Sequence, residues 1–411
     1  MAIDYHEQSL AIAREIKDRR GEGNVLNSLG LIYQDLGNGD QAIKYYHQSL
    51  RIARETKDRL IEINSLIYLG TSYREFSNYA KSIEYYQEGL TISSLIKDES
   101  MQGRSLKSLG SSYYFLGNYT KAIEFYEQSL LIANKQKDRY LEGSLLVNIG
   151  LAYREMGNYS KAIKYYEQSL VIARKIKYRR GEGVSLGNLG ETYQSLGSYS
   201  KAIEYHEQSL GIARETQNRL VEGNSLGNLG ETYYSLGNYP KALEYHEQHL
   251  AIAREVKNRH GERIAFSNIA EILKKQNQSD LAIVFYKQSI NVSESIRKDN
   301  RPLSRELQAS YTETVAGTYR SLADLLLSQG RIGEAQKVLE LLKVQELNDI
   351  TEGSRSPSPQ QNQVALSKVK EQIIQNHTSL IQFGQLLSEC TKKECAKLEE
   401  YKTTHRQLTE A

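Results

Sequence analysis

The stretch SLGNLGETYQSLGSYSKAIEYHEQSLGIARET, residues 185–216, holds one unit of a pattern that fills most of this chain. Its first part places Leu186, Leu189, Gly190 and Tyr193 at spacings of three and four residues, which puts them on one face of an α-helix. A second amphipathic helix is expected from residue 201. Its apolar positions are Ala202, Ile203, Tyr205 or His206, Leu210 and Ile212.

The unit returns every 40 residues. Its glycine recurs at Gly30, Gly70, Gly110, Gly150, Gly190 and Gly230, followed by Ala270 in the seventh copy. The tyrosine three residues later recurs at Tyr33, Tyr73, Tyr113, Tyr153, Tyr193 and Tyr233, followed by Leu273. A helix pair cannot bury its apolar face alone, so the copies are expected to stack into a solenoid.

Each turn between the two helices carries a glycine, such as Gly197, which suits the left-handed backbone just past a helix end. The small residues Gly190 and Ala202 are expected to let the paired helices approach closely. Thr120, Ser160 and Ser200 are predicted to cap the start of the second helices.

The order Leu186, Leu189-Gly190, Tyr193, Gly197 and Ala202 resembles the tetratricopeptide signature W-x2-L-G-x2-Y…A-x3-F…P. Leucine replaces the tryptophan, histidine or tyrosine replaces the phenylalanine, residues such as arginine replace the terminal proline, and the period is 40 instead of 34. This longer unit looks like that of the Pins/LGN polarity scaffolds and kinesin light chain. The resemblance implies an all-α, right-handed superhelical solenoid of antiparallel helix pairs that binds proteins and is not an enzyme.

The expected domain plan follows from the repeat positions. Residues 1–20 align with a second helix whose first helix is missing, and 21–300 hold seven repeats, the last one degenerate. Residues 301–350 form a longer, degenerate helix pair, 351–363 a Ser/Pro-rich flexible linker, and 364–411 a helical C-terminal segment. The lone helix at 1–20 indicates a trimmed or capping end and could mediate self-association.

Residues 319–350 resemble the segment that joins such repeats to a caspase-like CHAT peptidase domain in cyanobacterial proteins. Two functions therefore stay open. The chain is either a free-standing scaffold or the sensor arm of a CHAT peptidase whose catalytic domain lies beyond residue 411. Within this chain, the two cysteines, Cys390 and Cys395, lie in one amphipathic stretch and fit neither a zinc site nor a nucleophile with its base.

Composition excludes several other classes of protein. A net charge of +3 gives no reason to expect the clustered basic face of a nucleic-acid-binding protein. The sequence also lacks the run of roughly 18 apolar residues that a membrane-spanning helix needs. The few cysteines fit a cytoplasmic protein, and the near-identical repeats favour a bacterial one. His206 and His246 share their register with tyrosines, so we interpret them as packing rings and expect neither metal nor cofactor.

The candidate binding residues lie on the first helices, at positions that the core does not need. They are Asn148, Asn188, Asn228 and Asn268, then Glu191, Glu231 and Glu271, and then Gln194 and Tyr234. An asparagine carries a donor and an acceptor, so a ladder of them can hold the peptide groups of an extended partner. The resemblance to polarity scaffolds implies the same role for these four asparagines.

An alternative is that the asparagines are copied with the repeat and only face water. Gly187 and Gly227 precede two of them and weaken the helix by about 1 kcal/mol each, which favours the binding interpretation.

Charge along this face is expected to orient the partner. The earlier repeats offer Arg74, Arg104, Lys107 and Arg154, and the later ones offer Glu191, Glu231 and Glu271. The acidic part of a partner is therefore predicted near repeats two to four and its basic part near repeats five to seven. Charged runs such as IAREIKDRR, residues 12–20, are interpreted as a solvated outer face.

Overall fold

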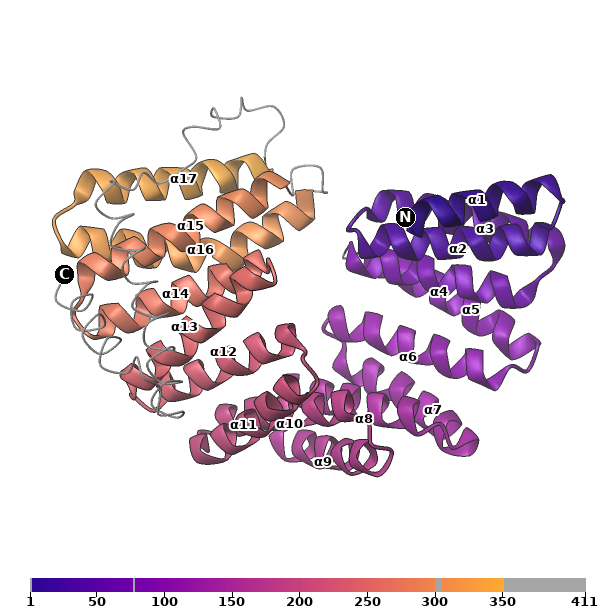
Figure 1. The fold of residues 1–411 in the computed structure, drawn as a ribbon, viewed down its shortest axis with the longest axis horizontal. Coiled ribbons are helices and arrows are strands. Elements are labelled where there is room, and N and C mark those ends of the chain that lie inside the picture. The colour runs from indigo at the N-terminus through magenta and orange to yellow at the C-terminus, as the bar shows by residue number, and fades with distance from the viewer. Residues whose placement is uncertain (1, 77, 300–304, 351–411) are drawn as a thin grey trace, which may run out of the picture. The chain divides into compact units, whose positions relative to one another are not determined.

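The computed structural model describes residues 2–76, 78–299 and 305–350, and over these residues the protein is all helical, with 17 helices and no strand (Figure 1). This confirms the predicted fold class, a solenoid of helix pairs. The helices are α1 (Ala2–Glu15), α2 (Arg19–Asp35), α3 (Gly39–Thr56), α4 (Arg59–Glu75), α5 (Tyr79–Leu95), α6 (Glu99–Phe115), α7 (Tyr119–Gln136), α8 (Arg139–Glu155), α9 (Tyr159–Lys175), α10 (Arg179–Ser195), α11 (Tyr199–Glu215), α12 (Arg219–Ser235), α13 (Tyr239–Glu255), α14 (Arg259–Lys275), α15 (Ser279–Asp299), α16 (Arg305–Ser328) and α17 (Ile332–Ile350).

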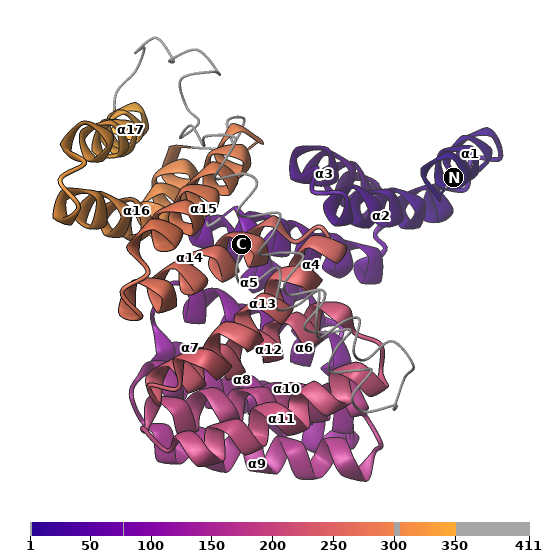
Figure 2. The ribbon, with the colours of Figure 1, turned by 60° about the vertical axis from the view of Figure 1, so that its left-hand side comes forward.

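The described residues divide into two compact units, one up to residue 212 and the other from residue 213. Within each unit, helices that follow one another in the sequence pack side by side, as α2, α3 and α4 do in the first and α12, α13 and α14 in the second (Figure 2). Each unit is therefore built from local contacts alone, as expected of a solenoid.

The first helices of neighbouring repeats also contact one another. In the first unit α2 contacts α4, α4 contacts α6, α6 contacts α8 and α8 contacts α10, and in the second unit α12 contacts α14. Among the described helices, no two second helices of neighbouring repeats make contacts of comparable extent. Within each unit the first helices therefore form the more closely spaced, inner row.

A glycine–ring contact joins the two helices of each repeat. Tyr46 and Tyr166 of the second helices are fully buried against Gly30 and Gly150 of the first helices. A Cβ atom on Gly150 would lie 2.5 Å from Tyr166 Cε1, so no larger side chain fits there without a shift of the ring. In the seventh repeat Ala270 and Tyr286 take these two positions, and both are buried.

A second aromatic contact closes the pair at its exposed edge. The rings of Tyr153 and Tyr165 stack with their centroids 5.5 Å apart, and Lys161 Nζ lies 4.6 Å from the centroid of Tyr153. The same ammonium-over-ring arrangement recurs at Lys81, Lys121, Lys201 and Lys241. Stacking and cation–π attraction thus support the pairing that the glycine permits.

The turns contain the expected glycines, but the predicted caps are wrong. Gly117 and Gly157 have φ of +79° and +73°, in the left-handed region. The second helices α7 and α9 begin two residues earlier than expected, so Asn118 and Asn158 are the N-caps and accept from Lys121 N at 3.1 Å and Lys161 N at 3.2 Å. Thr120, Ser160 and Ser200 lie inside the first turns of α7, α9 and α11.

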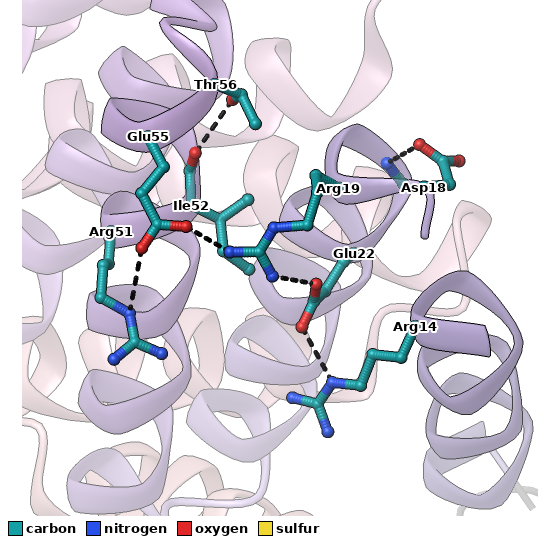
Figure 3. Close-up of polar contacts among 9 residues, drawn as sticks. Arg14, Asp18, Arg19, Glu22, Arg51, Ile52, Glu55 and Thr56 are labelled. Atoms are coloured by element: carbon teal, nitrogen blue, oxygen red, sulfur yellow. Dashed lines mark hydrogen bonds and ion pairs between the residues drawn. The ribbon is translucent and has the colours of Figure 1, made fainter. Parts of the chain in front are cut away.

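The charged residues of the run at 12–20 are all exposed, as the sequence predicts, and two of its arginines also bind a buried carboxylate. Glu22, which follows this run, is only 5% exposed, and Arg14 and Arg19 of the run both bind its carboxylate (Figure 3). Burial raises the pKa of Glu22, but these two arginines outweigh it and hold that pKa below its ordinary value. The same clamp recurs as Arg54–Glu62–Arg59, Arg174–Glu182–Arg179 and Arg214–Glu222–Arg219.

The ends of the repeat array are helical as far as they are described. Tyr319 and Leu326 of α16 are fully buried, and Gly330, with φ of +70°, separates α16 from α17. The linker and helical segment predicted for 351–411 lie outside the described residues.

At the other end, α1 packs on α2 and leaves Tyr5 and Ile12 exposed. Self-association through this helix stays a prediction. No helix in the described ranges is long and apolar enough to cross a membrane.

The glycine–ring contact predicts opposite tolerance at two helical glycines of the first unit. Gly150→Val should lower the free energy of unfolding by about 2 kcal/mol, because its side chain overlaps the buried ring of Tyr166. Gly211→Val is the matched control, since a Cβ at Gly211 meets nothing within 4 Å, and it should change stability by less than about 0.5 kcal/mol. Urea denaturation followed by circular dichroism measures both, and equal stability of the two variants would contradict the account.

Candidate functional site

Two of the four predicted asparagines, Asn148 on α8 and Asn188 on α10, lie on the inner row of the first unit. Both are half-buried, beside the fully buried Ile149 and Leu189. Asn188 Nδ2 donates to Val184 O at 2.9 Å, which leaves its side-chain oxygen as an acceptor. Among the described residues, the side chain of Asn148 has no hydrogen-bond partner, so its donor and acceptor are both available.

The other two asparagines belong to the second unit, Asn228 on α12 and Asn268 on α14, and both are half-buried. Near them, Glu231 is exposed and Tyr234 is half-buried. Glu271 is held by its own repeat, since it accepts from the hydroxyl of Tyr286 and lies 3.7 Å from Lys274 Nζ. This carboxylate is therefore less available to a partner than the sequence indicates.

The charged residues of the first unit are not all separate. Arg154 of α8 forms an ion pair with Glu191 of α10, and it lies 3.3 Å from Glu155. Sequence reasoning assigned Arg154 and Glu191 to opposite ends of a partner, but the structure makes them compensate each other. Gln194 lies half-buried one turn beyond Glu191 on α10.

A cluster of three cations remains on α4 and α6. The guanidinium of Arg74 lies over the ring of Phe115, 5.5 Å from its centroid, and Arg104 Nη1 donates to Asn64 Oδ1 at 3.2 Å. Burial lowers the pKa of Lys107, and the charges of Arg74 and Arg104 lower it further. These three residues form the positive part of the inner row, as expected from the sequence.

A cavity of about 230 Å³ opens between α8 and α10, with the end of α9 as its floor. Asn148 contributes to its wall, so one predicted binding residue borders a hollow in the surface. The lining residues are Arg139, Tyr140, Gly143, Ser144, Val147, Asn148, Ser169, Ile172, Ala173, Ile176, Tyr178, Arg180, Gly181 and Val184.

Sequence reasoning missed two tyrosines at this cavity, Tyr140 and Tyr178. Their rings meet edge to face with centroids 5.3 Å apart. Tyr178 occupies the N-cap position of α10, where Asp138, its counterpart in α8, accepts a hydrogen bond from Leu141 N at 3.0 Å. The departure from the repeat was visible, because the corresponding residues are Asp18, Asp58, Asp98, Asp138, Asn218 and Asn258.

His206 and His246 replace the buried tyrosine of the glycine–ring contact. Both are fully buried, and in the described structure neither ring nitrogen of either residue has a hydrogen-bond partner. Burial lowers the pKa of His206 to about 4 and that of His246 to about 3, the second one also through the charge of His249. Both rings are therefore neutral packing groups at neutral pH.

The helix pairs, their inner row and the glycine–ring contact define a helical repeat protein of the tetratricopeptide type. The family model for the tetratricopeptide repeat matches residues 21–94, 101–175, 141–215 and 221–295, which together make up more than half of the sequence. The chain belongs to the tetratricopeptide repeat family, and as a member of it is a scaffold for protein–protein interaction.

Solved structures with the same fold are distant in sequence. Aspartyl phosphate phosphatase F from Bacillus subtilis is 13% identical, with a TM-score of 0.55 over 89% of this chain and 96% of its own. The Rap conjugation gene regulator of plasmid pLS20, solved with the Phr* peptide, is 17% identical, with a TM-score of 0.50 over 86% and 96%. A signal transduction ATPase with numerous domains and a tetratricopeptide repeat sensor, from Pyrococcus horikoshii, is 22% identical, with a TM-score of 0.54 over 67% and 42%. No curated protein sequence matches the chain.

The buried histidines predict that stability falls as the pH drops below about 6.5, the ordinary histidine pKa. The unfolded chain then binds protons that His206 and His246 do not bind until the pH nears 4 and 3, respectively. Across this window His206 can remove up to about 3 kcal/mol of stability and His246 up to about 5 kcal/mol. Thermal melts at pH 7 and pH 5 measure the loss.

The matched variant is His206→Tyr with His246→Tyr, which restores the ring found at Tyr166. It should show a smaller difference between the two pH values. An unchanged difference would mean that other groups cause the acid sensitivity.

Proposed function

We propose that this scaffold binds an extended polypeptide segment along the first helices of the unit formed by residues 1–212. The observation that carries the proposal is the contact between α8 and α10, which places Asn148 and Asn188 on neighbouring helices of one inner row. Both side chains keep an unused hydrogen-bonding group, and both are half-exposed.

The spacing of the repeats suits an extended chain. Contacting helices lie about 8–10 Å apart, and an extended chain rises about 3.3 Å per residue. One asparagine per repeat therefore meets a peptide group about every three residues. An amide side chain can donate to a carbonyl and accept from an N–H of the partner. The two residues Asn148 and Asn188, here called the asparagine clamp, therefore need no particular partner sequence.

Charge adds direction to the binding. Arg74, Arg104 and Lys107 gather on α4 and α6, so an acidic part of the partner is expected over these helices. The compensation of Arg154 by Glu191 confines this preference to the earlier repeats. The Rap regulator solved with its Phr* peptide is a protein of the same fold that binds a peptide, which supports the proposal by analogy.

A second candidate function is the sensor arm of a longer enzyme, in particular a CHAT peptidase. The tetratricopeptide sensor of the Pyrococcus horikoshii ATPase supports it, because the matched part there is only 42% of that chain. Blotting of cell extract with an antibody against residues 200–260 tests this candidate. A native product near 46.8 kDa contradicts it, and a product larger by a whole domain supports it.

The asparagine clamp predicts that the double variant Asn148→Ala, Asn188→Ala has a lower affinity for peptides. A phage-displayed library of random dodecapeptides is selected on the wild-type chain, and the dissociation constants of the selected peptides are measured by fluorescence anisotropy. The double variant should bind them about 30-fold more weakly, because two hydrogen bonds of about 1 kcal/mol each are lost.

Asn134→Ala is the control, since Asn134 is an exposed asparagine near the end of the second helix α7. It should leave the affinity unchanged. Equal affinities for the wild type and the double variant would contradict the clamp, and a selection that yields no binding peptide would contradict peptide binding altogether.

A further inference from the structure

The cavity between α8, α9 and α10 has apolar walls that reach the solvent. Val147 of α8 and Ile172 of α9 line it, together with Val184, which is 41% exposed on α10. Tyr140 and Tyr178 are 60% and 39% exposed. At about 30 Å³ per water molecule, the volume of about 230 Å³ corresponds to about eight waters, which is enough for one bulky side chain.

The two tyrosines replace groups that serve the fold in an earlier repeat. At the corresponding positions, Arg20 Nε lies 2.9 Å from Asp58 Oδ2, and Asp58 caps α4 by accepting from Ile61 N at 3.1 Å. Tyr178 makes no side-chain cap hydrogen bond. Loss of a cap costs about 1 kcal/mol, and the exposed rings do not offset it by full burial. The replacement of the arginine and the aspartate by two tyrosines is explained if the tyrosine rings contact a binding partner.

Charge at the cavity indicates what that contact is. Of the two arginines in the lining, Arg139 is paired with Glu142. Arg180 is exposed and has no ion-pair partner among the described residues. An unpaired guanidinium beside apolar walls is complementary to a carboxylate that lies next to an apolar side chain.

We propose that this cavity is a side-chain pocket that takes one bulky apolar side chain of the bound segment, with an acidic residue beside it at Arg180. The pocket rests on the proposed function, because Asn148 joins its wall to the asparagine clamp. The clamp holds the partner's main chain without regard to sequence, and the pocket selects one residue and its acidic neighbour. The exposed rings of Tyr140 and Tyr178 then cover the bound side chain.

The test restores the earlier repeat's arrangement in the variant Tyr140→Arg, Tyr178→Asp. This variant should fold at least as well as the wild type, because it regains a cap and an ion pair. Dodecapeptide libraries are selected on both proteins. The wild type should enrich a bulky apolar residue next to an acidic one, and the variant should lose that preference and bind the wild-type peptides at least ~10-fold more weakly.

Val184→Glu is a second variant, in which a charge enters the pocket. Its matched control is Val171→Glu, since Val171 is 66% exposed on α9 and does not line the cavity. The first should lose the affinity for the selected peptides, and the second should keep it.

If the wild type and the Tyr140→Arg, Tyr178→Asp variant select the same motif, the proposed pocket is contradicted. Equal binding by Val184→Glu and Val171→Glu would contradict it too. In either case the asparagine clamp is unaffected. If the wild type selects no peptide, both proposals are wrong.

Discussion

Each of the first six repeats depends on the contact between a glycine of the first helix and an aromatic ring of the second. Gly150 and Tyr166 show why, since the ring fills the space that any Cβ would need. This contact sets how closely the two helices of a repeat approach. The stacked rings and the ammonium groups support the same helix pair, whereas the Arg–Glu clamps join one repeat to the next. Because each repeat forms its own contact between two helices, the chain can lengthen by adding repeats and needs no single large core.

The inner row follows from the same geometry. Because the first helices of neighbouring repeats approach one another, residues that the core does not use stand one repeat apart on a shared surface. Asn148 and Asn188 are such residues. Evolution of binding in a solenoid then needs changes only at these positions, while the glycine and the ring preserve the fold. In the proposed pocket, the tyrosines at 140 and 178 are changes of this kind, at the cavity beside the row.

Most of the fold could be predicted from the sequence, because the same pair of amphipathic helices recurs every 40 residues. The error at Thr120 came from the helix start, since the cap is the preceding asparagine, Asn118, and hydroxyl and amide side chains compete for that role. The buried Glu22 was missed because one of its two partners, Arg14, belongs to another helix, α1, and because it follows a run of charged residues. The positions of the asparagines followed from register, whereas the pairing of Arg154 with Glu191 and the cavity depend on how two helices pack.

Photo-cross-linking tests most directly whether a partner lies on the inner row. A peptide selected on the wild-type chain carries benzoylphenylalanine at single positions, and mass spectrometry locates the residues to which it attaches. The account predicts attachment to α8 and α10, around Asn148, Asn188 and the cavity between these helices. Attachment to the outward-facing second helices, for example at Leu131 of α7 or Val171 of α9, would contradict it.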